Sequence, residues 1–528
     1  MNPKIISQNF NLSDITAKLL YSRGFRNKNS INNFINPSLS HFNSSKNIPG
    51  INSIKETIQE HIDWKSKIFI VGDFDCDGVC SSAILHKTLN RMGAFNEVII
   101  GDRFKDGYGL SKRIINKISK NNGNLIITVD LGINNKKEIE YAKKKGIDVI
   151  VIDHHLSDNP PDCLFADLKV KKGKYPFEYF SAAGLTWKIC QYLLNDNLYD
   201  LLDIVTMSTV ADLVPLKNEN RVITKFGLEK LTNSPNLGLK ELKVLKGLNK
   251  KKINTGHIGY ILGAIINAQG RLYNNQKSFE LLTTNNREKA KKIAAELDKT
   301  NQERKRISNK CLKKAKEKIN KEDNVIILKH DIPPGIVGLV AGDIKEELGK
   351  PTIIFGQPDK NGICKGSGRS ISPLNLKKDI LDNTRYLLES GGGHAKAAGF
   401  SVKNKNFDKF KNRSLQITKN IKYKTIQYDM SLDVSQINYN LIKELKIFEP
   451  TGMGNPSPKF LIHDRVTNIS PTKNGEHLLF KMGNISCIAF QMADKINQLR
   501  SNEKIIGNLD INKYRGSTSI QVKIKKIL

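Results

Sequence analysis

The stretch that decides both the fold and the site is Lys67-Ile-Phe-Ile-Val-Gly-Asp-Phe-Asp-Cys-Asp-Gly-Val79. Its apolar run, Ile68 to Val71, is stopped by a glycine, which is typical of a buried strand. Three alternate carboxylates follow at once, those of Asp73, Asp75 and Asp77. Carboxylates at the end of a buried strand repel one another and are tolerated where a cation neutralises them, so the pattern predicts a site for a hard metal ion.

Two other interpretations of these acids are a polar turn whose carboxylates cap a helix, and a calcium loop. The order Asp-x-Asp-x-Asp-Gly also opens an EF-hand, whose twelfth position must be a bidentate glutamate. Counting from Asp73, the twelfth residue is Ile84, which lies in an apolar segment that we expect to be a buried helix. An EF-hand is therefore excluded, and the polar turn stays open at this point.

Strand-like and helix-like segments alternate from Ile51 to Asp153. The expected strands are 68–71, 97–100, 125–129 and 148–152, and the expected helices are 79–92, 111–120 and 136–145. Ser111 is the expected N-cap of the second helix. Alternation at this spacing implies right-handed βαβ crossovers and a parallel sheet, so the expected fold class is α/β.

Further ligand-type residues follow the later strands of this sheet. Asp130 follows one strand and Asp153-His154-His155 follows the next. Further on, Asp212 follows a buried, helix-like apolar run that begins at Asp203. In open α/β sheets, side chains at the carboxyl ends of the strands meet in one crevice. One such acid alone is more often a helix cap than a ligand, but four groups at one edge predict a shared site. Carboxylates with imidazole suit Mn²⁺ or Mg²⁺ better than Zn²⁺.

Composition limits the kind of protein. The 528 residues suffice for several domains, and a formal net charge of +33 favours a polyanionic partner, nucleic acid before an anionic membrane. Lys, Asn and Ile are abundant throughout, so part of this charge reflects composition alone. No apolar run approaches the roughly 18 residues of a membrane span, and no secretory signal is visible. Seven scattered cysteines without a Cys-x-x-Cys pair argue against disulfides and structural zinc, and we expect a cytoplasmic protein.

Four motifs, in this order, resemble those of a known superfamily. They are Asp73-x-Asp75-x-Asp77, Thr128-Val-Asp130, Asp153-His154-His155 and Val210-Ala-Asp212. They are similar to the motifs of the DHH phosphoesterases, and their order and context resemble the RecJ family of single-strand-specific DNA exonucleases. The resemblance runs from Leu19 to the C-terminus. It implies a hydrolase that digests single-stranded DNA from 5′ to 3′ and releases 5′-mononucleotides in recombination and repair.

The resemblance also divides the chain into domains. We expect an N-terminal extension over 1–50, packed on the first domain, a DHH catalytic domain over 51–275, and a connecting helix over 276–320, where apolar residues recur in steps of three and four. A second α/β domain, the DHH-associated domain, is expected over 321–418, and an OB-fold β-barrel over 419–528. The expected strands of this barrel are 425–428, 459–462, 478–482, 486–490, 504–509 and 519–525. Lys513 and Arg515 are candidates for a basic groove in it.

The donor set predicts how the metal is held. Two divalent ions, about 3.5–4 Å apart, can activate a water and stabilise a pentacovalent phosphorus. The expected core ligands are Asp75, Asp77, Asp130, His154 and Asp212, with Asp130 best placed to bridge. Asp73 is expected to be a further ligand or an acid behind the ligands. Asp153 is expected to orient His154, as carboxylates do behind metal-bound imidazoles.

The remaining site residues come from the resemblance. It implies that His155 contacts the scissile phosphate and that His394 does so from the facing domain. His394 lies in one of two glycine-dense loops, 365–370 and 390–400, whose backbone N–H groups can approach a phosphate closely. The expected substrate-binding residues are Arg103, Arg271, Arg369, Ser370, Gly392 and Gly393. Of these, Arg103, Arg369 and Ser370 are the candidates for a 5′-phosphate pocket.

Two departures from the RecJ-family pattern concern the grip on the substrate. Ala264-Ile265 precede Ile266-Asn267-Ala268 where Pro-Arg is usual, so one expected basic contact is absent while Arg271 remains. Pro333-Pro334-Gly335-Ile336 stands where His-x-Gly-Val usually opens the second domain. Neither departure touches the expected metal ligands.

Three classes of function stay open. The first is a RecJ-type exonuclease with two Mn²⁺ or Mg²⁺ ions, acting as a monomer on single-stranded DNA, away from membranes, with a helicase and a single-strand-binding protein as partners. The second is another DHH phosphoesterase, acting on oligoribonucleotides, cyclic dinucleotides or polyphosphate. The third is a catalytically inert scaffold that binds single-stranded DNA. The basic charge and the long C-terminal region favour the first, and a scaffold would lose ligands that this chain keeps.

Overall fold

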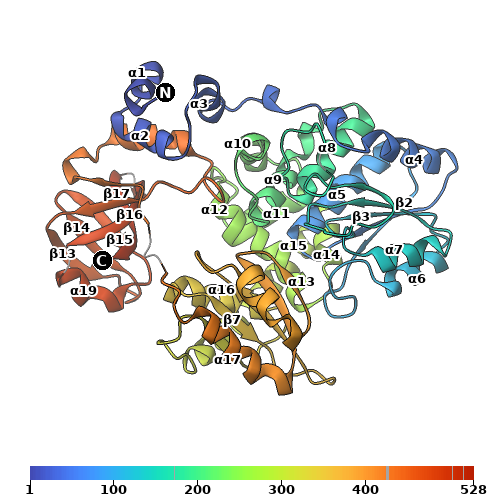
Figure 1. Ribbon diagram of the computed structural model, residues 1–528. Coiled ribbons are helices and arrows are strands. Elements are labelled where there is room, and N and C mark those ends of the chain that lie inside the picture. Colours follow the sequence, from blue (N-terminus) through green and yellow to red (C-terminus); the bar gives the residue numbers. More distant parts are fainter. Residues whose placement is uncertain (172, 424–426, 502, 515–516) are drawn as a thin grey trace. The chain divides into compact units, whose positions relative to one another are not determined.

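The computed structural model describes residues 1–171, 173–423, 427–501, 503–514 and 517–528. The chain divides into two compact units (Figure 1). The larger unit contains Ser45–Asp212 and Glu229–Thr425, and the smaller unit contains Met1–Ser44, Leu213–Leu228 and Ile426–Leu528. Each unit therefore combines segments that are distant in the sequence.

The larger unit begins with a five-stranded parallel sheet of order β2-β1-β3-β4-β5. Its strands are β1 (Ile68–Gly72), β2 (Asn96–Ile100), β3 (Leu125–Val129), β4 (Asp148–Ile152) and β5 (Leu164–Ala166). Phe69 and Val71 pack against α6 (Lys112–Lys120) and α7 (Lys136–Lys143) on one face. On the other face, α5 (Cys76–Arg91) contacts β1 and β2, and α8 (Ala182–Leu194) contacts β3 and β4 (Figure 1). The predicted parallel α/β sheet is confirmed, as is Ser111 as the N-cap of α6.

The register of this sheet brings the strand ends together. Gly72, the last residue of β1, pairs with Ile100 and Val129, and Val129 pairs with Ile152. Helix α5 begins only four residues after β1, with Asp75 as its N-cap. A Cβ atom on Gly78 would lie 2.4 Å from the carbonyl oxygen of Asp73, so a glycine lets α5 begin this close to the strand.

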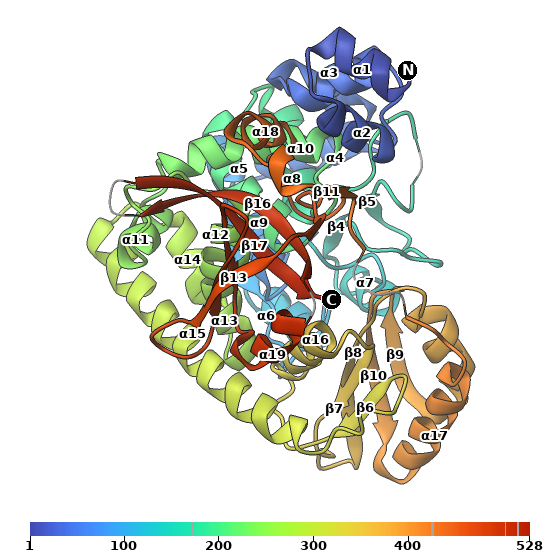
Figure 2. The same cartoon turned by 90° about the vertical axis from the view of Figure 1, so that its left-hand side faces the viewer.

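A largely helical region follows the first sheet. It comprises α9 (Leu202–Ala211), α11 (Leu237–Leu245), α12 (Thr255–His257), α13 (Gly263–Leu272) and α14 (Gln276–Thr283), and α4 (Ile51–Asp63) precedes the sheet. The thirty-residue α15 (Arg287–Lys316) then leads to the second sheet (Figure 2). The single helix expected over 276–320 is thus two helices, because Asn286 caps a new start by accepting the Lys289 N–H. Among the helices of the described residues, none has the length and apolar character needed to cross a bilayer.

The second sheet of the larger unit is mixed and has the order β6-β7-β8-β10-β9. Its strands are β6 (Ile326–Lys329), β7 (Thr352–Phe355), β8 (Ile363–Arg369), β9 (Leu388–Gly393) and β10 (Ala397–Lys403). Helix α16 (Val337–Leu348) covers one face, where Ile326 and Ile354 are buried. Helix α17 (Phe407–Thr418) covers the other, where Phe410 packs on Phe355 (Figure 2).

The smaller unit is built on a seven-stranded sheet of order β11-β12-β16-β17-β15-β14-β13. The strands are β11 (Met430–Leu432), β12 (Phe460–His463), β13 (Val466–Pro471), β14 (Leu478–Met482), β15 (Ile485–Ala489), β16 (Lys504–Tyr514) and β17 (Ser517–Ile527), with α18 (Tyr439–Leu445) and α19 (Ile496–Ser501) between them. Five of the six expected strands are confirmed. The sixth expected strand, 425–428, begins with residues outside those that the structure describes. Arg515 and the side chain of Lys513 also lie outside them.

The N-terminal helices lie within Met1–Ser44 and belong to the smaller unit, so the prediction that residues 1–50 pack on the first domain is wrong for them. Residues 45–50 belong to the larger unit. These helices are α1 (Pro3–Phe10), α2 (Asp14–Ser22) and α3 (Lys28–Ile35). Ile6 and Ile31 are buried in the same core as Phe448 and Phe460. The apolar spacing of such helices predicts a buried face but does not identify the surface that covers it.

A buried arginine joins three segments of the smaller unit. Arg221, on α10 (Asn218–Thr232), donates hydrogen bonds to the main-chain oxygens of Phe34, Ile447 and Glu449 at 2.9, 2.7 and 2.8 Å. Burial, and then the charge of Arg23, lower its pKa to about 10. Because these acceptors are carbonyl groups, Arg221 is a structural cross-link between chain segments.

Candidate active site

The edge where the parallel strands end gathers the acids and imidazoles that the sequence singled out. Three sets of ligand-type atoms lie there, the atoms of each set within 4.8 Å of one another: Asp73-Asp75-Asp130, Asp77-His154-Asp212 and Asp130-His154-His155. We call Asp73, Asp75, Asp77, Asp130, Asp212 and His154 the acidic cluster. Asp130 and His154 each belong to two of the three sets, and Asp130 is the one carboxylate that two sets share.

His154 is oriented as a neutral ligand. Its Nδ1 lies 2.9 Å from the main-chain oxygen of Phe180 and donates to it, which leaves Nε2 unprotonated. Nε2 faces carboxylate oxygens of Asp130, Asp77 and Asp212 at 3.3, 3.6 and 3.7 Å. Burial, together with the positive charges of His155 and Lys169, lowers the pKa of His154 to about 3. A neutral imidazole whose free nitrogen points at three carboxylates is arranged to share a cation with them.

Asp77 is held by the N-terminus of α8 and by α9. Its carboxylate accepts the main-chain N–H groups of Ala182 and Ala183 at 2.7 and 2.8 Å, and the Ser208 hydroxyl at 2.6 Å. Burial and the charge of Asp75 nevertheless raise the pKa of Asp77 to about 6. The hydrogen bonds fix the direction of the carboxylate, but they do not remove the cost of placing it beside other acids.

The carboxylates of Asp73, Asp130 and Asp212 are also destabilised by neighbouring carboxylates. Burial, and then neighbouring carboxylates, raise the pKa values of Asp73, Asp130 and Asp212 well above the ordinary 3.8. Asp130 also adopts a left-handed backbone, with φ of 64°, which is uncommon outside glycine and often marks functional sites. A divalent cation would relieve this repulsion, and a ligand set of carboxylate oxygens with one imidazole nitrogen fits Mn²⁺ or Mg²⁺.

Asp153 and His155 form a pair beside the cluster. His155 Nδ1 lies 2.6 Å from Asp153, whose other oxygen accepts the Ile133 N–H. Burial alone would lower the pKa of His155, but the hydrogen bond and charge of Asp153 raise it to about 9, so the imidazole is protonated at neutral pH. The Tyr108 hydroxyl lies 3.0 Å from His155 Nε2. His155 therefore presents a positive charge at the rim of an acidic site.

This arrangement corrects one prediction. Asp153 was expected to orient the ring of His154, but it contacts only the main-chain N–H of that residue, at 2.7 Å. The His154 ring is oriented by the Phe180 carbonyl instead, and Asp153 orients His155. In the sequence both histidines directly follow Asp153. The conformation of the backbone determines which imidazole ring the Asp153 carboxylate contacts.

Three arginines lie near this edge of the sheet, and we call Arg103, Arg271 and Arg369 the arginine group. Arg103 donates to the Gly270 oxygen at 3.0 Å and stacks 3.9 Å above the Phe74 ring. Arg271 donates to the Gly335 oxygen. Burial lowers the pKa of each guanidinium, and for Arg271, with repulsion from Arg103 and Arg304, to about 10. Within the described part of the chain, none of the three forms an ion pair with a carboxylate.

The two glycine-dense loops lie in the second sheet. Arg369 ends β8, and its guanidinium donates to Ser367 Oγ and to the Gly368 oxygen at 2.8 Å. The hydroxyl of Ser370 donates to the Leu374 oxygen at 2.8 Å, so it is held by the backbone. Gly392 and Gly393 end β9, and a Cβ on Gly393 would lie 2.4 Å from the Ala397 oxygen. His394 follows, and burial, with the charges of Arg369, Lys169 and others, lowers its pKa.

Residues that the sequence did not single out complete the site. Ser208 holds Asp77, Tyr108 contacts His155, and Lys169 donates from its Nζ to the His154 main-chain oxygen at 2.5 Å. None lies in a distinctive motif, and each reaches the site only because of the fold. Where Pro-Arg is usual in the family, this chain has Ala264 and the fully buried, uncharged Ile265.

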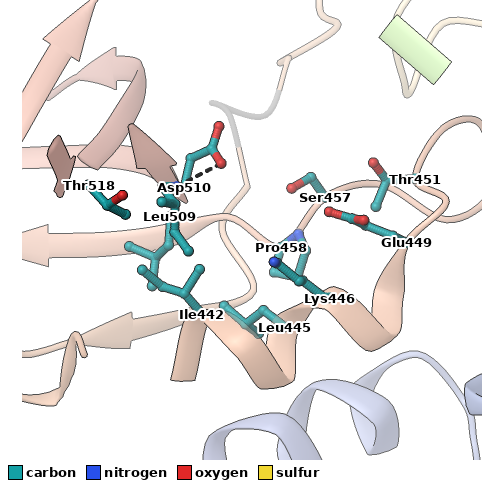
Figure 3. A pocket seen from close by; sticks show the side chains of 11 residues that line it. Ile442, Leu445, Lys446, Glu449, Thr451, Ser457, Pro458, Leu509, Asp510 and Thr518 are labelled. Carbon is teal, nitrogen blue, oxygen red and sulfur yellow. Dashed lines mark hydrogen bonds between the residues drawn. The ribbon is translucent and has the colours of Figure 1, made fainter. Parts of the chain in front are cut away.

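A separate cavity lies in the smaller unit. It has a volume of about 500 Å³, with Ile442, Leu445 and Leu509 on its floor and Lys446, Glu449 and Asp510 around it (Figure 3). Asp510 forms an ion pair with Lys523. None of the predicted site residues lines this cavity, and its two carboxylates make it a poor match for a phosphate backbone.

Comparisons with known domain families match three regions of the chain. Residues 67–214 match the N-terminal domain of the DHH family, residues 322–420 match the DHHA1 domain, and residues 428–526 match the RecJ OB domain. The single-stranded-DNA-specific exonuclease RecJ of Bacillus subtilis is 31% identical over 541 residues, which cover 99% of this chain and 69% of that protein. This chain belongs to the RecJ family.

Solved RecJ structures agree with this fold. RecJ of Thermus thermophilus in complex with Mn²⁺ matches with a TM-score of 0.85 at 24% identity, over 99% of this chain and 77% of that one. A second structure, exonuclease RecJ bound to manganese, matches with a TM-score of 0.62 at 26% identity, over 73% of this chain and 97% of that one. The predicted architecture of DHH domain, linking helix, DHH-associated domain and C-terminal OB domain is confirmed. As a RecJ-family member, the chain is a single-stranded-DNA exonuclease of the metal-dependent DHH hydrolases.

Proposed function

We propose that this protein uses two divalent metal ions to digest single-stranded DNA from the 5′ end, releasing 5′-mononucleotides in recombination and repair. The observation that carries the proposal is the acidic cluster, in which Asp77, Asp130 and Asp212, whose pKa values are raised, face one neutral imidazole. A cluster of this kind is costly unless cations neutralise it. The manganese in the RecJ structure that is 26% identical supports Mn²⁺ as one such cation, with Mg²⁺ as the alternative.

The proposed ligands are Asp75, Asp77, Asp130, His154 and Asp212, with Asp73 as a further ligand. Asp130 is the proposed bridge, because it is the one carboxylate that two of the three sets of ligand atoms share. Two ions held here would supply an activated water and stabilise the charge of the pentacovalent phosphorus. Because the phosphorus is attacked directly by water, no serine or cysteine nucleophile is needed.

His155 is the proposed phosphate contact on the catalytic side. It is held by Asp153 and protonated at neutral pH, so it can donate a charge-assisted hydrogen bond to a phosphate oxygen. His394 is the proposed contact from the DHH-associated domain, and Gly392 and Gly393 let the backbone come close to the substrate. Both histidines would counter negative charge that develops as the phosphodiester bond breaks.

The arginine group is the proposed grip on the 5′ end. Arg103, Arg369 and Ser370 would bind the terminal 5′-phosphate, and Arg271 would support the same strand. Buried guanidinium groups without carboxylate partners favour an anionic ligand. Recognition of a terminal phosphate would give the enzyme its 5′ to 3′ direction.

The organisation and context of the enzyme complete the proposal. We propose a DHH domain over 51–275, a connecting segment over 276–320, a DHH-associated domain over 321–418 and an OB domain over 419–528 that binds the strand. The protein would act as a monomer in the cytoplasm. A helicase that opens duplex DNA and a single-strand-binding protein would supply its substrate.

A cleavage assay with labelled ends tests the proposal. Single-stranded DNA, duplex DNA and short RNA, each carrying a 5′ or a 3′ label, are incubated with Mn²⁺ and with EDTA. We expect mononucleotides from single-stranded DNA alone, with the 5′ label released first. Preferential cleavage of short RNA or of cyclic dinucleotides would identify another DHH phosphoesterase, and binding without cleavage would identify an inert scaffold.

A further inference from the structure

Lys169 lies in a short turn that directly follows the first sheet. Asp167 comes immediately after β5 and is almost completely buried. Its Oδ1 accepts the main-chain N–H groups of Lys169 and Val170 at 2.8 and 3.2 Å. These bonds fix the backbone of the turn, so the direction in which the Lys169 side chain leaves it is set.

The Lys169 side chain ends beside the acidic cluster. Its Nζ donates to the main-chain oxygen of His154 at 2.5 Å, directly behind the imidazole that faces the acids. Burial raises the pKa of Asp212 and lowers that of His394, and the charge of Lys169 opposes the first shift and adds to the second. Lys169 therefore lies beside the cluster at His154, and its charge also acts on His394 in the glycine-dense loop of the second sheet.

The ammonium group has capacity for a further acceptor. An ammonium carries three donors, and the His154 oxygen takes one of them. Within the part of the chain that the structure describes, Lys169 forms no ion pair, and its side chain is only partly buried. A partly exposed, fixed cation without a carboxylate partner, at the rim of an acidic site, is suited to bind a phosphate.

We propose that Lys169 binds the DNA substrate, with its ammonium group on a non-bridging phosphate oxygen of the strand where it passes between the acidic cluster and His394. The inference rests on the proposed function and adds a substrate-binding residue to it. The approaching phosphate is repelled by the carboxylates of the cluster, and a lysine at its rim lowers that repulsion without occupying a ligand position. Asp167 is then the positioning residue for Lys169.

Lys169→Met tests the contact, with Lys171→Met as the matched control from the same turn. Lys171 is exposed and its Nζ lies near the Phe165 ring, so its removal changes the charge equally. Binding of a single-stranded oligonucleotide is measured in EDTA at several salt concentrations. We expect Lys169→Met to weaken binding about 10-fold and to reduce the slope of log K against log salt by about 0.7, the value for one lost contact to a single strand. Lys171→Met should leave both unchanged, and Lys169→Arg should restore the slope.

A substrate variant separates phosphate binding from a structural role. Single phosphates of the oligonucleotide are replaced in turn by neutral methylphosphonates, and cleavage is measured with wild type and Lys169→Met. At the contacted position, the replacement should slow cleavage by the wild type about 10-fold and leave the cleavage rate of Lys169→Met unchanged. Additive effects at every position, or a normal salt slope with weakened Mn²⁺ binding, would overturn the proposal and leave only support of His154. If wild type binds the strand but never cleaves it, the proposed function fails while the salt slope still reports on Lys169.

Discussion

The acidic cluster and the arginine group lie in the same unit and hold opposite charges in different ways. In the cluster, backbone N–H groups and a serine hydroxyl hold Asp77, while burial and the charge of Asp75 raise its pKa. In the arginine group, the guanidinium groups of Arg103, Arg271 and Arg369 donate to carbonyl oxygens of glycines. The two regions are neighbours, since Asp73 and Asp75 partly counter the effect of burial on the pKa of Arg103.

Each region lacks neutralising charge of the opposite sign. Hydrogen bonds fix the direction of the side chains in both, but neither region contains enough opposite charge to neutralise itself. The cluster therefore requires cations, and the arginine group requires anions. A phosphodiester strand with two divalent ions supplies both, which is why the two regions together favour phosphoester cleavage over simple metal storage.

Removing the shared carboxylate, Asp130, should produce the largest effect. Asp130→Ala takes a carboxylate from two of the three sets of ligand atoms, so we expect cleavage of single-stranded DNA to fall to background. The loss should exceed the roughly 100-fold loss seen when residues behind metal ligands are changed. Release of labelled mononucleotides with Mn²⁺ measures it. The control is Asp162→Ala, an acid with a fully exposed side chain, which should cleave normally.

The two adjacent histidines should separate chemistry from metal binding. His155→Ala removes the protonated imidazole and should lower kcat by about 10²–10⁴, while Mn²⁺ affinity is retained. His154→Ala should lower both kcat and Mn²⁺ affinity, because the Nε2 of His154 faces three of the acids. Turnover and calorimetric Mn²⁺ titration measure the two quantities. Equal loss of Mn²⁺ binding in both variants would make His155 a ligand.

The stability of the metal-free protein should fall as pH rises. Between about pH 4 and 6 the folded protein keeps a proton on Asp77 that the unfolded chain has lost, so the free energy of unfolding decreases through that range. A pKa raised from 3.8 to about 6 corresponds to about 3 kcal/mol. Urea unfolding in EDTA at several pH values measures it. Mn²⁺ should reverse the loss, by about 2.7 kcal/mol at a hundred times its Kd.

Asp130→Asn provides the matched variant for this experiment. It removes one of the repelling charges at constant size, so in EDTA its stability should depend less on pH than that of wild type, and Mn²⁺ should stabilise it less. An unchanged pH dependence would mean that the carboxylates do not interact in the folded protein.

The arginine group should show the smallest effect, confined to the 5′ end. Arg369→Met should reduce the preference for 5′-phosphorylated over 5′-hydroxyl DNA by about 10- to 100-fold, the contribution of hydrogen bonds to a charged group. Initial rates on the two substrates measure it. Arg413→Met, an exposed arginine on α17, should keep the preference. A loss of rate that is equal for both substrates would move Arg369 out of the 5′-phosphate pocket.

Local sequence patterns were sufficient for the parallel sheet and for the edge at which its acids meet. Apolar runs followed by Asp or His predicted β1, β3 and β4 almost to the residue. Both the apolar run and the residues that end it are local features of the sequence. The same argument placed Asp77, Asp130 and His154 in one region, since the carboxyl ends of parallel strands share an edge. Asp212 ends the helix α9 instead, so the strand pattern alone did not place it.

Contacts between distant segments were not predictable in this way. The N-terminal helices bury Ile6 and Ile31 against the C-terminal sheet, and nothing in an amphipathic pattern identifies its partner. Arg221 resembles a surface arginine in the sequence but bonds three segments of the smaller unit. Lys169 gains its position from the Asp167 turn and the His154 carbonyl, both of which depend on the fold.

Anomalous diffraction from a crystal soaked in Mn²⁺ tests the central claim most directly. We expect two Mn²⁺ peaks about 3.5–4 Å apart, bounded by Asp75, Asp77, Asp130, His154 and Asp212, with Asp130 contacting both ions. No peak at this edge of the sheet, or a single ion that Asp130 does not touch, would contradict the account.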